Sequence, residues 1–187
     1  MADAGALDVD MGEGAVRLER MADRHVEPLR GACARDLEIW NIYPVSWHGV
    51  HFERTLAESA RLTECGARVP FVIVWNGEVV GMTCYLGPDP ANGVVEIGGT
   101  YIEPSVRGTG VNSIMKRLMI ERAFGAGFAR IEWRVDTRNA RSLAAVAKLG
   151  ATREGTLRRN RITWTGHVRD TAVFGLLKDE WSESHKG

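Results

Sequence analysis

Two repeating patterns of apolar and polar positions dominate the middle of the chain. In 111–118, apolar residues recur at i, i+3, i+4 and i+7, which predicts an amphipathic helix with Lys116 and Arg117 on its solvent side. In Arg130–Asp136, apolar and polar residues alternate, as they do in a half-buried strand. Together with the apolar run Val94–Ile102, these segments predict a strand–helix–strand unit, which requires a parallel pair of strands.

Weaker sequence patterns predict the remaining helices and strands of a mixed α/β fold. Asn76-Gly77 lies between two apolar runs, and this dipeptide is a strong signal for a hairpin turn. The other expected elements are a strand at 15–18, helices at about 23–33 and 52–65, hairpin strands at 71–75 and 78–86, a helix from Asn139 to Gly150, and a final hairpin of 152–159 and 168–177. We expect one domain over residues 14–187, preceded by a mobile acidic tail over residues 1–13.

Composition narrows the function classes. The 187 residues are 44% hydrophobic and 26% charged, with a net charge of zero, so we expect no nucleic-acid partner. No apolar run is long enough to span a bilayer, and we expect no membrane partner. Cys33, Cys65 and Cys84 lack metal-type spacing and predict reduced thiols in a cytoplasmic protein. His48 and His51 have no third ligand at suitable spacing, so we expect no metal.

A glycine-rich turn stands between the predicted strand and helix. Arg107-Gly108-Thr109-Gly110 precedes the helix, whose first turn has unpaired N–H groups and a positive dipole end. Two glycines would let a phosphate approach these groups. The stretch lacks the lysine of a Walker A loop and the third glycine of a dinucleotide fingerprint. A plain strand-to-helix turn is the alternative.

The order of these motifs resembles the GNAT superfamily of acyl-CoA-dependent N-acyltransferases. Arg107, Gly110 and Asn112 occupy the fixed places of its signature [Q/R]-x-x-G-x-[G/A], where Asn112 departs from Gly or Ala. The stretches RGTGVN, DTRNARS, LGATREGTLRRN and RDTAVFGLL are similar to one branch, the bacterial ribosomal-protein N-terminal alanine acetyltransferases. The likeness covers about residues 15–181 and implies a mixed, twisted, splayed sheet with helices on both faces.

The resemblance also implies a site for acetyl-CoA as cosubstrate. Its pantetheine arm would lie between the parallel strands Val94–Ile102 and Arg130–Asp136 where they splay apart, and Gly98-Gly99 would help to open that gap. The residues expected to bind it are Tyr101, Ile102, Arg107, Gly108, Thr109, Gly110, Val111, Asn112 and Asn139.

Candidates for the proton-transfer groups follow from the same comparison. Glu96 lies between apolar neighbours and matches a catalytic glutamate of the histone-acetylating branch, and the alternative is an exposed strand carboxylate. Asp170 and His167 on the last hairpin are alternatives for the base, and the glutamate of the alanine-acetylating branch is missing, since its place falls near Arg161. Val146 replaces the tyrosine acid of many family members. 

A serine replaces that tyrosine in the alanine-acetylating branch, three residues after the helix-opening asparagine. Ser142 matches this place, and its alternative role is to serve the first turn of a helix. Asn139 is expected to cap that helix as well as to contact the pantetheine.

The acceptor side is expected to be aromatic. Trp40, Tyr43 and Trp47 fall in the segment that walls the acceptor pocket in this family, and Asp170 resembles a residue that lines it. Packing under an irregular loop is the alternative for each ring, and an ion pair with an arginine is the alternative for Asp170. The basic residues Arg153, Arg158, Arg159 and Arg161 could meet an acidic substrate, meet the 3′-phosphate of CoA, or form a solvated strand face.

The resemblance therefore predicts an acyl-CoA-dependent N-acyltransferase, with acetyl as the expected acyl group. The acceptor would be a primary amine such as a protein N-terminus, an amino acid or a small amine, and the protein a monomer or homodimer. A non-catalytic acyl-CoA-binding or sensor domain and a nucleotide-phosphate binder are the alternatives.

Overall fold

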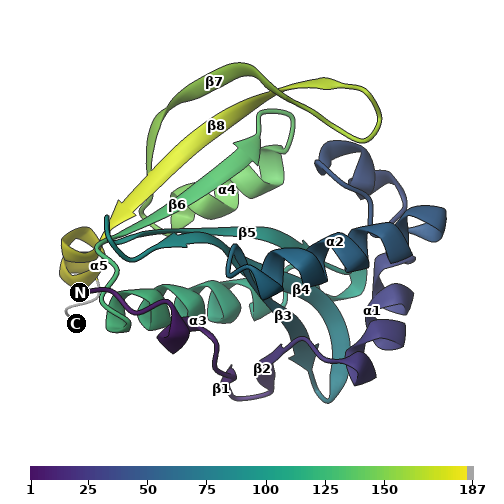
Figure 1. The fold of residues 1–187 in the computed structure, drawn as a ribbon, viewed down its shortest axis with the longest axis horizontal. Coiled ribbons are helices and arrows are strands. Elements are labelled where there is room, and N and C mark those ends of the chain that lie inside the picture. The colour runs from purple at the N-terminus through teal and green to yellow at the C-terminus, as the bar shows by residue number, and fades with distance from the viewer. Residues whose placement is uncertain (185–187) are drawn as a thin grey trace.

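An open, mixed sheet forms the centre of the molecule (Figure 1). The computed structural model describes residues 1–184. The strands are β1 Met11–Glu13, β2 Val16–Arg20, β3 Arg68–Trp75, β4 Glu78–Asp89, β5 Val94–Ile102, β6 Arg130–Asp136, β7 Thr152–Ile162 and β8 Val168–Leu177. The α-helices are α1 Val26–Cys33, α2 Phe52–Glu64, α3 Val111–Gly125, α4 Ala140–Lys148 and α5 Lys178–Ser184.

The strands follow the order β1-β2-β3-β4-β5-β6-β8-β7. β5 and β6 are parallel neighbours joined through α3, which confirms the predicted strand–helix–strand unit, and the other neighbouring pairs are antiparallel. The hairpin at Asn76-Gly77 is also confirmed. Both residues have positive φ, 52° and 85°, as a tight turn matched to the twist of its strands requires.

Helices cover both faces of the sheet, as the resemblance implied. On one face, α1, α2 and the segment between them pack against β3 and β4 around the buried Trp40 and Phe52. On the other face, α3 packs with Val146 of α4 and Trp181 of α5 against β5, β6 and β8. We name these the α1–α2 face and the α3–α4 face. Each has its own hydrophobic core, so the sheet is apolar on both sides over its centre.

The first 13 residues pack against the domain, which differs from the expected mobile tail. Leu7 is fully buried in the core of the α3–α4 face. The backbone N–H of Asp3 donates to the carbonyl of Ala126 at 2.8 Å, and β1 pairs with β2. The acidic composition suggested a solvated tail, but Leu7 and Met11 supply enough apolar surface to hold the segment in place.

Lys116 also differs from its prediction. The sequence pattern put it on the solvent side of α3, whereas the side chain is only 6% exposed. Its Nζ donates to Oγ1 of Thr100 on β5 at 2.8 Å, and that hydroxyl is bonded to Oγ1 of Thr83 at 2.8 Å. The aliphatic part of a lysine side chain can pack in an apolar interface. The hydrophobic pattern of α3 therefore does not show whether Lys116 faces the core or the solvent.

Burial of Lys116 has a measurable effect on stability. It lowers the pKa of the folded amine from 10.5 to about 7. Between these values the unfolded chain binds one more proton than the folded chain, so stability should rise with pH. From about pH 7.5 to about pH 9, we expect the free energy of unfolding to rise by about 2 kcal/mol more in the wild type than in Lys116→Met.

Chemical denaturation at the two pH values measures this difference in slope. The exposed Lys148 of α4 provides the matched control, because Lys148→Met should keep the wild-type rise. Equal slopes in wild type and Lys116→Met would mean that the amine stays charged in the folded protein.

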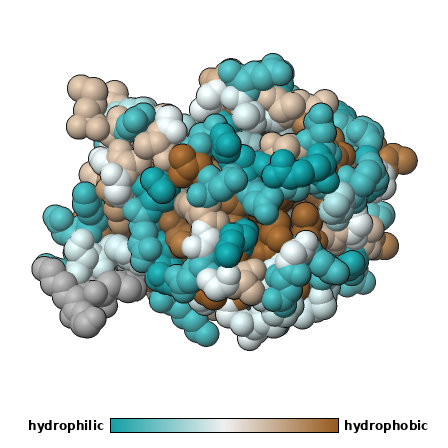
Figure 2. Space-filling view, turned by 90° about the horizontal axis from the view of Figure 1, so that it is seen from below, coloured by the Kyte–Doolittle hydropathy of each residue, from teal (hydrophilic) through white to brown (hydrophobic). Residues whose placement is uncertain are grey.

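The surface carries mixed polarity. Figure 2 shows the molecule from below the view of Figure 1, and on that face hydrophobic atoms form separate areas bordered by hydrophilic side chains. Within residues 1–184, no helix is both long and apolar enough to cross a membrane.

Candidate active site

The turn between β5 and α3 has an open backbone that depends on glycine. Pro104 starts a short 3₁₀ turn after Ile102, and Gly108 and Gly110 follow with φ of 83° and 91°. These angles favour glycine, because other L-residues rarely adopt them. A Cβ built on either glycine would meet no heavy atom within 4 Å, so no neighbouring side chain fills the space above the turn.

Several backbone donors in this turn are free. In the described part of the chain, the N–H groups of Gly108, Gly110, Val111 and Asn112 have no hydrogen-bond acceptor. They stand at the first turn of α3, at the positive end of its dipole. This arrangement suits a diphosphate, which supplies several acceptor oxygens and negative charge.

Thr109 and Arg107 differ from those donors, because their polar groups are used inside the protein. The N–H and hydroxyl of Thr109 both bond the carbonyl of Val106, at 3.4 and 2.7 Å. Nε of Arg107 donates to the carbonyl of Ile102 at 2.9 Å, and its Nη2 pairs with Asp36. Its guanidinium ties the turn to the end of β5 and to Asp36, and its expected part in binding acetyl-CoA stays a prediction. No local pattern indicates Asp36 as a partner, because it lies 71 residues away along the chain.

The parallel strands beside this turn separate along their length. β5 and β6 pair only from Val94 with Arg130 to Glu96 with Glu132, although both strands continue beyond these positions. The facing backbone edges are therefore parted over the later residues of both strands. A ligand that carries amide groups could bond such an edge as an added strand does.

Two glycines shape β5 near the gap. The register of β4 with β5 shifts between Met82 and Cys84, opposite the stretch that holds Gly98 and Gly99. Gly99 has a φ of 58°, and a Cβ there would lie 2.8 Å from Sγ of Cys84. Beyond this irregularity Tyr101 is buried, with its hydroxyl donating to the carbonyl of Ala32 at 2.8 Å. Tyr101 can therefore face the gap only with its backbone.

Glu96 lies in a partly buried, arginine-rich environment. Its neighbours Val95 and Ile97 point into the core of the α3–α4 face, so Glu96 points to the α1–α2 face. The side chain is 22% exposed, and Oε2 lies 3.6 Å from Nε of Arg134. Burial raises the pKa of Glu96, and the nearby Arg134 and Arg161 oppose this rise. A raised pKa is what a general base near neutral pH requires.

The start of α4 holds Asn139 and Ser142 in a capping arrangement. Oδ1 of Asn139 accepts the backbone N–H of Ser142 at 3.0 Å, which fits the predicted cap. Within residues 1–184, the hydroxyl of Ser142 makes no hydrogen bond, so it is free to meet a ligand. Val146 is buried on the sheet side of the same helix.

The aromatic residues between α1 and α2 have two kinds of environment. Trp40 and Trp47 are buried in the core of the α1–α2 face, and Nε1 of Trp40 donates to the carbonyl of Cys33 at 3.1 Å. Tyr43 differs, because its hydroxyl donates to the carbonyl of Thr100 on β5. Burial raises the pKa of Tyr43 to about 12. Among the three predicted wall residues, Tyr43 alone bonds β5, while the two tryptophan rings pack as core.

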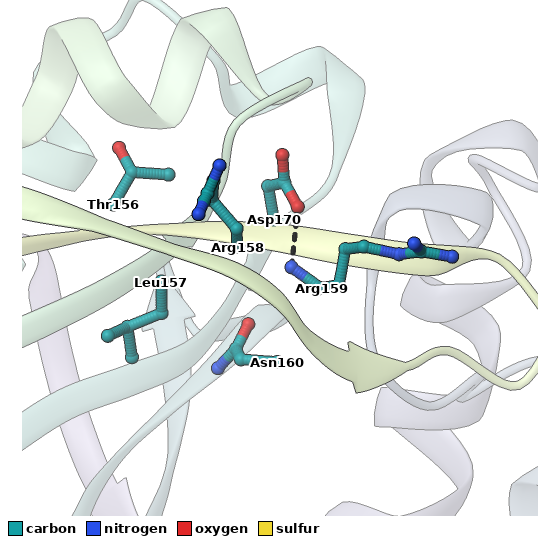
Figure 3. Close-up of a pocket in the computed structure, with 6 residues that line it drawn as sticks. All are labelled: Thr156, Leu157, Arg158, Arg159, Asn160 and Asp170. Atoms are coloured by element: carbon teal, nitrogen blue, oxygen red, sulfur yellow. Dashed lines mark hydrogen bonds between the residues drawn. The ribbon is translucent and has the colours of Figure 1, made fainter.

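Asp170 holds an irregularity in the last hairpin. The register of β7 with β8 shifts between Leu157 and Arg161, and the bulged Arg159 has a φ of 51°. Oδ1 of Asp170 accepts the backbone N–H of Arg159 at 2.7 Å. Figure 3 shows this contact in the open hollow lined by Thr156, Leu157, Arg158, Arg159, Asn160 and Asp170. The carboxylate thus braces the bulge through a backbone hydrogen bond, and its contact with the acceptor stays a prediction.

Two further findings limit the chemistry of the site. Among the described residues, no three His, Cys, Asp or Glu side chains are grouped closely enough to hold a metal ion. Cys33 and Cys84 are buried and free, and burial raises the pKa of both thiols. Neither thiol is therefore prepared as a thiolate nucleophile.

Comparison with solved structures finds the same fold elsewhere. A probable GNAT-family acetyltransferase of Chromobacterium violaceum ATCC 12472 is 29% identical, covering 94% of each chain with a TM-score of 0.82. A GCN5-related N-acetyltransferase of Brucella melitensis is 26% identical, covering 94% of this chain and 81% of that one with a TM-score of 0.82. Mycobacterium smegmatis RimJ, in complex with CoA-disulfide, is 22% identical, covering 94% and 90% with a TM-score of 0.78. The likeness to RimJ is one of fold.

The sequence itself matches a family. Residues 37–151 match the acetyltransferase (GNAT) family, and this range is more than half of the chain. It contains the β5–β6 gap, the glycine turn and the start of α4. The chain belongs to the GNAT acetyltransferase family.

Proposed function

We propose that this protein transfers an acetyl group from acetyl-CoA to a primary amine. The observation that carries the proposal is the group of free backbone N–H donors at Gly108 and at Gly110–Asn112, next to the gap between β5 and β6. The acceptor classes that we consider are a protein N-terminus, an amino acid and a small amine.

The residues around the turn fit the cosubstrate in charge and in shape. Gly108 and Gly110 leave the space that a diphosphate needs, and the N–H groups of Val111 and Asn112 point from the helix start. The parted edges of β5 and β6 offer backbone groups to the amides of pantetheine. When bound there, acetyl-CoA supplies the activated acyl group.

The chain supplies three further functions for the transfer. Glu96 would take the proton of the ammonium or amine, directly or through water. A backbone N–H of β5 at the gap would stabilise the carbonyl oxygen as negative charge develops on it. The Ser142 hydroxyl would donate to the leaving sulfur, because Val146 rules out a tyrosine at the place where many family members have one.

Replacing Ser142 with alanine tests that last role. We expect kcat to fall roughly 10- to 100-fold, because a hydrogen bond to the leaving group forms mainly in the transition state. The KM for acetyl-CoA should change little, and the cap should persist because it uses the backbone N–H of Ser142. Ser182→Ala on α5 is the matched control. Equal kinetics for Ser142→Ala and wild type would leave Ser142 as a helix residue only.

The activity itself is tested by measuring thiol release from acetyl-CoA across a panel of amines, with mass spectrometry of the products. The proposal expects amine-dependent release and a product heavier by one acetyl group. Tight binding of acetyl-CoA without release for any amine would favour a sensor domain. Competition by ATP without competition by CoA would instead favour a nucleotide-phosphate binder.

A further inference from the structure

A group of arginines beside Glu96 has no part in the chemistry proposed above. Arg134, Arg161 and Arg169, which we name the arginine cluster, come from β6, β7 and β8. Nε of Arg134 lies 3.6 Å from Oε2 of Glu96, and Nη2 of Arg169 donates to the carbonyl of Arg134 at 2.9 Å. Arg161 is paired in register with Arg169. The cluster therefore adjoins the proposed base.

Strand alternation places the cluster on the same face as Glu96. Trp133 and Ala172 belong to the core of the α3–α4 face, so Arg134 and Arg169 point to the α1–α2 face. Directly opposed residues of antiparallel strands share a face, which adds Arg161. Three neighbouring strands thus bring guanidinium groups to one area beside the gap.

Arg169 carries a buried donor without an acceptor. The residue is only 4% exposed, and in the described part of the chain its Nε has no hydrogen-bond partner. Oδ2 of Asp136 lies 3.9 Å away, but this carboxylate already binds Arg138 through both oxygens, at 3.0 and 2.8 Å. A buried guanidinium with an unused N–H is unfavourable unless an acceptor completes its hydrogen bonds, and an anionic acceptor would also balance its charge.

The carboxylates near the cluster are shared with other cations. Glu132 contacts Arg134 at 3.4 Å, but Arg130 holds it more closely at 2.9 Å. Glu96 contacts Arg134 at 3.6 Å, beyond hydrogen-bond distance. The area around Glu96 therefore has more positive than negative charge available to a ligand.

We propose that the arginine cluster binds a carboxylate of the acceptor, so that the substrate is an amine that carries a carboxylate close to its amino group. This inference rests on the proposed acetyl transfer. Arginine forms paired, charge-assisted hydrogen bonds with carboxylates, which gives both orientation and affinity. The amine then lies at Glu96 while the carboxylate lies at Arg134, Arg161 and Arg169.

The short distance between Arg134 and Glu96 limits how far apart the amine and the carboxylate of the acceptor can be. Because the two groups are 3.6 Å apart, one small molecule can reach both. A free amino acid has this form, and so has a peptide whose second residue is acidic. Polyamines have cations in place of the carboxylate, and the cluster would repel them.

Matched acceptor pairs test the inference with purified wild-type protein. L-Alanine and L-alaninamide differ in the α-carboxylate, while the peptide amides Ala-Asp and Ala-Asn differ in a side-chain carboxylate. We expect kcat/KM to be at least about tenfold higher for the acidic member of one pair, as one charge-assisted hydrogen bond would give. The pair that shows the preference identifies the source of the carboxylate.

Variants assign the preference to the cluster. Arg134→Gln and Arg161→Gln change exposed or half-exposed side chains, so they avoid the folding risk of replacing Arg169. Both should reduce the ratio between acidic and amide acceptors to near one. Arg122→Gln, an exposed change on α3, should keep the wild-type ratio. An unchanged ratio in both cluster variants would overturn the inference, as would equal turnover within both pairs of acceptors.

Binding measurements separate this inference from the proposed activity. Calorimetry with N-acetyl-L-alanine and N-acetyl-L-alaninamide, and with the N-acetylated forms of the two peptides, requires no turnover. If no amine releases thiol, the proposed activity fails, yet weaker binding of the neutral members and loss of the difference in Arg161→Gln would still support the carboxylate site. Equal binding within both pairs would overturn the site whatever the activity.

Discussion

Replacing Gly110 with tryptophan should reduce the affinity for coenzyme A by more than about 100-fold, the effect of losing two hydrogen bonds to a charged group. Gly110 stands at the head of α3 with open space around the position of a Cβ. An indole there would occupy the space above the free N–H groups of Gly108, Val111 and Asn112. Calorimetric titration with coenzyme A measures the loss.

The matched control separates blocking from backbone strain. Gly66, after α2, also has positive φ and open space around a built Cβ. A non-glycine residue in this conformation costs about 1–2 kcal/mol at either position. Gly66→Trp and Gly110→Trp should therefore lose similar stability, while only Gly110→Trp loses coenzyme A. Wild-type affinity in a folded Gly110→Trp protein would contradict the assignment of the turn.

Replacing Glu96 with glutamine should lower kcat by about 10²–10⁴, the usual contribution of a general base. The pH dependence gives a second readout with a definite sign. Burial raises the pKa of Glu96, and only the ionised carboxylate can accept a proton. Wild-type activity should thus fall as pH decreases through the raised pKa, and Glu96→Gln should lose this acidic limb.

Glu132 offers a close control for Glu96. It is the register partner of Glu96 on β6 and is partly buried in the same sheet, but Arg130 binds its carboxylate at 2.9 Å. Glu132→Gln should keep the acidic limb of the pH–rate profile. If Glu96→Gln keeps that limb as well, the base lies elsewhere in the site or is solvent.

Much of the fold could be predicted because its elements have clear periodic patterns. β5 has the predicted bounds Val94–Ile102, and β6 has the predicted bounds Arg130–Asp136. The turn at Asn76-Gly77 could be predicted because few residues tolerate the backbone that it needs. Gly108 and Gly110 were expected to leave room for a phosphate, and in the structure both have positive φ and open space around a built Cβ.

The parts that the sequence did not predict depend on contacts between distant residues. The sequence around Lys116 is compatible with a side chain that faces solvent and with one that faces Thr100. The packing of α3 on β5 determines which of the two positions it takes. Arg107 pairs with Asp36, and no local spacing indicates that contact. The register of a bulged strand such as β7 depends on its partner strand. Which residues of β8 lie opposite those around Arg159 could therefore not be predicted either.

The arginine cluster shows the same limit for the acceptor side. The sequence marks Arg161 only as one member of a basic stretch. The sheet order places it opposite Arg169 of β8, which in turn bonds the carbonyl of Arg134 on β6. The buried position of Arg169 depends on that arrangement. The proposed acceptor site therefore depends on tertiary structure to a greater degree than the glycine turn does.

The backbone donors at the start of α3 are the central feature of the proposed coenzyme A site, and an NMR titration tests them directly. Protein labelled with ¹⁵N would be titrated with coenzyme A while the amide resonances of Gly108, Gly110, Val111 and Asn112 are followed. We expect these resonances to show the largest shifts, with saturation at the affinity measured by calorimetry. Binding of coenzyme A that leaves these four resonances unmoved, or the absence of any binding, would contradict the account.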